Sequence, residues 1–480
     1  MLPLTAALRS SKRTRTRAAA SISLTTRLLV FTFVFLCADL GIISEADGAL
    51  AALAVALVLP SMAPYLLLII ASLQDAPGLS YKWWYGGFIL IGMVCLIHGI
   101  ASLSGRRAQQ NTILPTEIQL LSLSCMLLVI YGWVISILLD NLDIAVQSPH
   151  RNPSLVALLM AFMVTTAYSS LGQILRDTEG AGTLRLTLAA CLLHSLLIAL
   201  LQIPFGPTFL SSGYGRIAIL QAQQLVEPTS MGIPRLTSTF LTPNGFALNF
   251  GLMMMGLLSN FNEQKVGKPF AMLYLLGGIL VSTMTFSKAM AAFFLASGFL
   301  LMLNAFGPTI ILTTLAGLLP ALLYLATTGV LGKLAVAFRL PTSLDQLGYR
   351  GEAWNLILQK FDLFNWLIGT GTSHWPVFFE RQLTFSLADP HSFILSIPGS
   401  YGLVGILFYL ILLVLILKRA VHRTGATRML ACSLLLLFFV KDLYSVPYII
   451  GNTPMSFVIW LILGLFFTSP RTSCTKAATT

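Results

Sequence analysis

The sequence predicts an all-α polytopic membrane protein with about 12–14 transmembrane helices and one large loop outside the membrane. Of its 480 residues, 56% are hydrophobic and only 10% are charged, whereas a soluble domain carries about 25% charged residues. The mean hydropathy is +0.84. Apolar runs of about 20 residues recur along the chain. In lipid such runs form helices, because each backbone group must be bonded within the protein.

The apolar runs divide the chain into segments. They lie at about 27–44, 49–73, 84–103, 118–139, 154–175, 184–203, 245–259, 269–285, 288–305, 308–330, 400–417, 429–446 and 455–468. We therefore expect a basic N-terminal segment at 1–26, a membrane bundle at 27–330 with an outer loop at 205–244, a large loop at 331–391, C-terminal membrane helices at 392–468 and a tail at 469–480.

Basic residues predict the orientation. Segment 418–428 is a short, basic connection between two runs, which is typical of a cytoplasmic loop. Loops 205–244 and 331–391 then face outward, which means the periplasm if this is a bacterial inner-membrane protein. Segment 1–26 is basic and should be cytoplasmic, yet thirteen crossings would put it outside. Either an extra or re-entrant crossing lies near Pro60 and Pro64, or one run does not span the membrane.

The totals exclude several kinds of site. The net charge of +12 is explained by basic loops and tails in contact with membrane lipid, so no nucleic-acid partner is expected. The six cysteines form neither a CxxC motif nor a Cys/His cluster, which argues against disulfides and zinc. Asp39, His98 and His194 lie within apolar runs, where charge is costly, and cross-helix pairing is expected.

The large loop concentrates the charged residues. It contains Lys333, Arg339, Arg350, Lys360 and Arg381, together with Asp345, Glu352, Asp362, Glu380 and Asp389. Basic residues are disfavoured in outward loops, so they either bind a polyanion or pair with the neighbouring acids. Within the loop, the spacing of Trp354, Ile357, Leu358 and Phe361 predicts an amphipathic helix on the membrane surface or against the bundle.

Four short motifs follow one another in the second half of the chain. The first runs from Arg235 through Pro243-Asn244-Gly to Ala247, where Asn244 could cap a helix. The second is Thr285-Phe-Ser-Lys288-Ala, a polar step between two runs. The third is Gly348-Tyr-Arg350 through Trp354, followed by Gly369-Thr-Gly371, and we expect Leu367-Ile-Gly369-Thr-Gly371 to form a flexible turn. The fourth is Asp389-Pro-His391-Ser392 through Leu395, followed by Gly399, Gly402 and Gly405.

In this order the motifs resemble those of the O-antigen ligase and O-antigen polymerase superfamily, the glycosyltransferases of bacterial envelope polysaccharide synthesis. The resemblance covers about residues 230–410. It implies a GT-C-like bundle with its active face in the periplasm. Three residues depart from the family pattern: Lys288 stands for an arginine, Ser238 for a glycine and Ser392 for an asparagine.

The resemblance implies transfer of a glycan from a polyprenyl-diphosphate donor, such as undecaprenyl diphosphate, to an acceptor hydroxyl. A diphosphate leaving group needs cationic donors. Arg235, Lys288 and Arg339 are the candidate diphosphate ligands, and Arg350 is a candidate catalytic residue. The acceptor is a lipid A core sugar for a ligase, the growing polysaccharide for a polymerase, or a protein for an O-oligosaccharyltransferase.

A proton acceptor is also required, because a sugar hydroxyl attacks the anomeric carbon. Histidine titrates near neutral pH, and His391 is the candidate catalytic base, with Asp389 or Glu380 able to orient or replace it. The outer acids are scattered and form no DxD motif, so we expect a metal-independent transfer without a cofactor.

Two other kinds of protein fit parts of the sequence. A transporter or flippase of a lipid-linked or small-molecule substrate would have a similar number of helices, with its ionisable groups at the midplane of repeated halves. A structural membrane protein with a partner-binding loop would need no arginine and histidine pattern. The chain shows no clear internal repeat, and its charges gather in the outer loops, which favours the enzyme.

Overall fold

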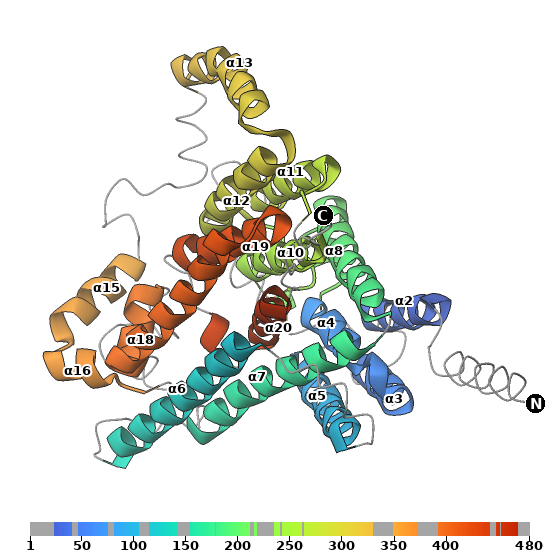
Figure 1. The fold of residues 1–480 in the computed structure, drawn as a ribbon, viewed down its shortest axis with the longest axis vertical. Helices are drawn as coiled ribbons and strands as arrows, with labels where there is room; N and C mark the ends of the chain where they lie inside the picture. Colours follow the sequence, from blue (N-terminus) through green and yellow to red (C-terminus); the bar gives the residue numbers. More distant parts are fainter. Residues whose placement is uncertain are drawn as a thin grey trace, which may run out of the picture.

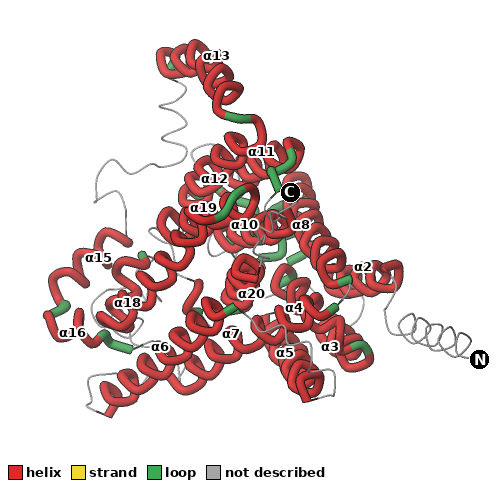
Figure 2. The backbone as a smooth tube through the Cα atoms, in the orientation of Figure 1, coloured by secondary structure: helices red, strands yellow, loops and turns green. Residues whose placement is uncertain are grey.

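The computed structural model describes residues 24–40, 47–74, 81–104, 115–141, 153–177, 179–211, 216–217, 235–240, 242–261, 264–329, 349–371, 392–441, 448–451 and 453–468. Within these ranges the regular structure is helical throughout, without strands, as Figure 2 shows. Six of the described helices are long and apolar enough to cross a membrane, and five shorter apolar helices accompany them. The prediction of an all-α membrane protein is thus confirmed, whereas the number of crossings stays a prediction.

The helices follow the chain as labelled in Figure 1. The first group is α2 (Leu24–Leu40), α3 (Asp47–Val58), η1 (Pro60–Met62), α4 (Ala63–Ser72), α5 (Tyr81–Ser104), α6 (Thr116–Asn141), α7 (Pro153–Arg176) and α8 (Gly180–Phe205). The second is α10 (Pro243–Leu258), η3 (Ser259–Phe261), α11 (Lys268–Thr285), α12 (Lys288–Phe306) and α13 (Pro308–Thr327). The third is α15 (Tyr349–Lys360), α16 (Leu363–Ile368), α18 (Phe393–His422), α19 (Gly425–Leu436), η5 (Leu437–Lys441), η7 (Tyr448–Ile450) and α20 (Pro454–Thr468).

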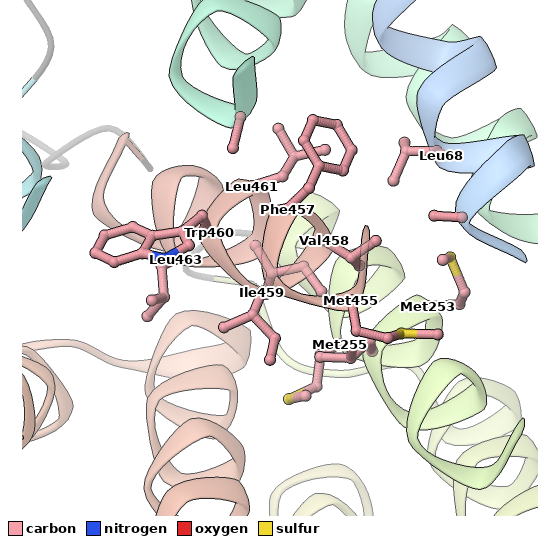
Figure 3. Close-up of a cluster of buried hydrophobic side chains, with 14 of the residues drawn as sticks. Leu68, Met253, Met255, Met455, Phe457, Val458, Ile459, Trp460, Leu461 and Leu463 are labelled. Carbon is pink, nitrogen blue, oxygen red and sulfur yellow. The ribbon is translucent and has the colours of Figure 1, made fainter. Parts of the chain in front are cut away.

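Helix α20 lies at the centre of the bundle, between α4, α7 and α10 (Figures 1 and 3). Nearly all of its side chains are buried, and the indole N–H of Trp460 donates to the carbonyl oxygen of Ile449 at 2.9 Å. Gly464 packs against Leu171 of α7, whose side chain would have to shift to admit a Cβ at this position. Close packing through small residues is how membrane helices associate, since lipid gives them no hydrophobic reason to do so.

Two cross-helix ion pairs show that α2 runs parallel to α8. Arg27, near the start of α2, pairs with Asp177 at 2.9 Å and contacts Thr183 at the start of α8. Further along α2, Asp39 pairs with His194 of α8 at 2.6 Å, and Phe35 stacks on the imidazole ring. The expected cross-helix bonding is confirmed for Asp39 and His194. We call the end of the bundle that holds Arg27 and Asp177 the Arg27 end.

The apolar run 49–73 is not one helix, because the chain turns back between α3 and α4. Ala49 lies beside Gly87, early in α5. Helix α5 runs in the same direction as α7, since Gly92 packs on Phe162 and Gly99 on Ser169. As α7 ends at the Arg27 end, α3 runs toward that end.

Helix α4 then leads away from the Arg27 end. The Tyr65 hydroxyl lies 3.3 Å from Asp177, whereas Ser72 accepts a hydrogen bond from Thr239, far from that end. The helix breaks at Leu59, whose φ of −127° and ψ of 71° are not helical, because the residue before a proline is pushed out of the α region. The break reverses the chain within run 49–73, and the side of the membrane that holds segment 1–26 stays a prediction.

The C-terminal boundaries also differ from the prediction. Helix α18 begins at Phe393 and continues to His422, so Lys418 and Arg419 belong to its last turns and not to a loop. Arg419 remains helical because its guanidinium lies over the rings of Phe466 and Phe467, 5.2 and 5.5 Å from their centroids. A cation near a helix C-terminus is also favoured by the helix dipole.

Candidate functional site

The first motif enters the interior of the bundle. We call residues 235–240 the Arg235 segment. It is not helical, yet Leu236 is only 4% exposed and Phe240 is fully buried. The outer loop at 205–244 stays a prediction, but this part of it packs inside the protein. Irregular backbone is tolerated at membrane depth only where the protein pairs its polar groups, so the partners of this segment matter.

Gln202, near the end of α8, supplies most of these partners. Its side-chain oxygen accepts hydrogen bonds from the amides of Thr237 (3.3 Å) and Ser238 (2.9 Å). Its nitrogen donates to the carbonyl oxygens of Ser238 (2.9 Å) and Phe209 (3.2 Å). The sequence interpretation missed Gln202, although an amide within the apolar run 184–203 was a signal that could have found it.

Ser238 has a backbone conformation that favours glycine. Its φ is 53°, in the left-handed region that glycine adopts without steric cost. The serine hydroxyl donates to the Ser195 carbonyl of α8 at 2.7 Å, an interaction that glycine lacks. Next to it, the Thr239 hydroxyl donates to the Ser72 carbonyl of α4 at 2.8 Å. The segment is therefore tied to both α8 and α4.

The Arg235 segment also binds the turn between α11 and α12, which is the second motif. The Arg235 Nε donates to the Thr285 carbonyl at 2.8 Å, and the amide of Leu236 donates to Met284 at 2.9 Å. Carbonyls in the last turn of a helix lack intrahelical partners, which makes them available here. Lys288 begins α12 two residues after Phe286, which turns the chain at a φ of 50°. Two predicted cations thus lie at one corner of the bundle.

The helix that follows the first motif is capped differently from the prediction. Asn244 lies inside α10, and Thr242 is the N-cap, its hydroxyl accepting from the amide of Gly245 at 3.0 Å. Pro243 occupies the first helical position, where its missing N–H costs nothing. Asn244 therefore has no capping role.

The third and fourth motifs meet through their glycines. The amides of Thr370 and Gly371 donate to the carbonyls of Gly399 (2.8 Å) and Ser400 (2.9 Å) in α18. Gly402 has a φ of 56° and a ψ of −148°, which interrupts α18 at this contact. The expected flexible turn is wrong: its first residues belong to α16, and its glycines are bonded to α18. The Tyr131 hydroxyl of α6 adds a hydrogen bond of 2.7 Å to the Ile368 carbonyl.

The predicted helix in the large loop exists as α15, with a different buried face. Ala353, Ile357 and Phe361 pack with Leu395 of α18, whereas Leu358 is 62% exposed. Figure 1 shows α15 and α16 beside α18, at the edge of the bundle. The exposed face continues into α16, with Leu363 at 74% and Phe364 at 60% exposure. This apolar face fits a helix pair that touches lipid.

The five predicted site residues are placed to different extents. The structure joins Arg235 to the turn that carries Lys288. Arg350 lies in the first turn of α15, with its side chain outside the described parts. Arg339 and His391 lie outside the described residues, as do Glu380 and Asp389. Within the described ranges, no three His, Cys, Asp or Glu residues gather as a metal site, and metal-independent transfer stays a prediction.

No protein-family model matches the chain, and no curated protein matches it.

Proposed function

We propose that the protein is a membrane glycosyltransferase that moves a glycan from a polyprenyl-diphosphate donor to an acceptor hydroxyl. The observation that carries the proposal is the hydrogen bond between Arg235 and Thr285, which brings two of the four motifs to one corner. The glycine contact between Gly371 and Ser400 joins the other two. Motifs that are distant in sequence are therefore packed together in pairs, as parts of a shared site would be.

The chemistry follows from the residue types. The acceptor oxygen bonds to the anomeric carbon while the bond from that carbon to the diphosphate oxygen breaks. His391 takes the proton of the acceptor hydroxyl. Arg235, Lys288 and Arg339 neutralise the departing polyprenyl diphosphate, and Arg350 stabilises charge in the transition state. The acceptor is a lipid A core sugar or the growing polysaccharide.

The proposed orientation puts the Arg27 end in the cytoplasm of a bacterial cell and the Arg235 segment toward the periplasm. Basic residues 1–26 precede α2, which begins at the Arg27 end. Arg176 and Arg185 flank the turn at that same end. Positive residues accumulate on the cytoplasmic side of inner-membrane proteins, and lipid-linked glycans are polymerised or ligated on the opposite face.

The test is complementation of a strain that lacks the gene, with Arg235→Ala, Lys288→Ala, Arg350→Ala and His391→Ala. We expect each variant to reach the membrane and to lose polymer on lipid A, while Arg216→Ala, a basic residue outside the motifs, serves as the matched control. Polymer that is made but not attached indicates a ligase, and single repeat units on lipid A indicate a polymerase. Normal surface glycan in both the Arg350 and the His391 variants would refute the proposal.

A transporter or flippase is the second candidate, and the Asp39–His194 pair favours it. Ionisable pairs within membrane helices are typical of proton and ion pathways. The pair lies between α2 and α8, and His194 directly precedes Ser195, which binds Ser238 of the first motif. If Asp39→Asn abolishes function while the Arg350 and His391 variants retain it, the transporter is the better account.

A further inference from the structure

We propose that Gln202 is a positioning residue, which holds the Arg235 segment against α11 and so fixes where the Arg235 guanidinium lies. The inference rests on the proposed function, because Arg235 is assigned to the diphosphate. It adds a residue from α8, outside all four motifs.

The hydrogen bonds of Gln202 use both ends of its amide. The oxygen accepts two backbone N–H groups and the nitrogen donates to two backbone carbonyls, which saturates its capacity. Gln202 is 0% exposed, as is Ser238. The amides of Thr237 and Ser238, both in buried residues, would lose their acceptor without Gln202, at a cost of about 1–3 kcal/mol for each group left unpaired.

The hydrogen bonds of Gln202 act on Arg235 through the few residues that lie between Ser238 and Arg235. Ser238 is held in the left-handed conformation between Gln202 and Ser195. Two residues earlier, Leu236 pairs with Met284, and the next residue back is Arg235, whose Nε binds Thr285. Without Gln202, the Arg235 segment has no regular secondary structure that would keep its backbone in the same position. Loss of the Gln202 hydrogen bonds should therefore displace the Arg235 guanidinium from the turn between α11 and α12, which carries Lys288.

The first measurement reports on position without any glycan. Leu236→Cys and Met284→Cys are introduced together in a variant that lacks the native cysteines, and disulfide formation is followed in membranes. The 2.9 Å contact between the two backbones brings these positions within reach of a disulfide. We expect cross-linking to slow by about tenfold when Gln202→Leu is added, and by less with Gln202→Glu, which keeps the acceptor oxygen.

Thr187→Val is the matched control. Thr187 is a buried polar residue of the same helix, but its hydroxyl bonds to Thr183 within α8. We expect it to leave the cross-linking rate unchanged. Equal rates in the Gln202→Leu and Thr187→Val backgrounds would overturn the proposal.

The second measurement is rescue of function. Gln202→Leu should lower glycan attachment at a normal protein level, and the oxidised 236–284 disulfide should restore it, with reductant removing the effect. Because a disulfide also stabilises the fold, the rescue is compared at equal levels of folded protein, where only a positioning defect remains to be restored. If cross-linking slows but glycan attachment is unchanged, the positioning role is overturned. If Arg350→Ala and His391→Ala are also active, the proposed function fails separately.

Discussion

Replacing Gly402 with alanine should detach α16 from α18. At Gly402 the φ of 56° and ψ of −148° fall in a region open almost only to glycine. An added Cβ would also collide with the backbone of Leu367 and Ile368. The conformational strain alone costs about 1–3 kcal/mol, which corresponds to a shift of roughly 5- to 150-fold toward the detached state. The collision adds to this, so the shift is a lower bound.

Hydrogen exchange measures the detachment directly. The amides of Thr370 and Gly371 donate to α18 only when the segments are joined, so their exchange in Gly402→Ala should accelerate by at least the same factor. Gly86→Ala is the control, since a Cβ on Gly86 in α5 meets nothing within 4 Å. If exchange at 370–371 is as slow in Gly402→Ala as in the parent protein, the strain argument is wrong.

Three further predictions follow from other contacts. Arg27→Ala leaves Asp177 as a partly buried charge without its 2.9 Å partner, so it should destabilise the protein by about 3–5 kcal/mol, measured as loss of folded protein on heating in detergent. Asp39→Leu should cost more stability than the double variant Asp39→Leu/His194→Leu, because the single change strands one member of the pair; a cycle without coupling contradicts this. A polarity-sensitive dye at Phe364→Cys in α16 should emit as in lipid, whereas dye at the exposed Lys360→Cys should emit as in water; equal emission would show that the face does not touch lipid.

Much of the fold could be predicted from the sequence because a membrane helix appears there as a long run of apolar residues. A break near Pro60 was predicted because thirteen crossings conflicted with a cytoplasmic segment 1–26. The structure locates the break at Leu59. The ends of α18 were not predicted, because Arg419 remains helical by stacking on Phe466, a contact between distant parts of the chain. Hydropathy averages over such contacts and cannot report them.

The sequence predicted which residues belong to the candidate site better than it predicted how they contact one another. Arg235 and Lys288 were found from their motifs, but their connection runs through the backbone carbonyl of Thr285, which leaves no mark on the sequence. The same holds for Ser238, whose positive φ became visible only in the structure. In α15 the helical spacing was right, but Ala353 and not Leu358 completes the buried face, because α18 lies on that side.

The Arg235 segment also sets an order of events during synthesis. Its link from Arg235 to Thr285 spans 50 residues of sequence, so the segment leaves the ribosome before its partner exists. At about 5–20 residues per second, it waits roughly 3–10 s for α11 to be made. Until then the amide of Leu236 has no acceptor on α11, and the chain is held by partners that are already made, Gln202 and Ser195 of α8 and Ser72 of α4. The corner that we assign to the diphosphate is therefore completed late, by a helix hairpin that inserts after the residues it must meet.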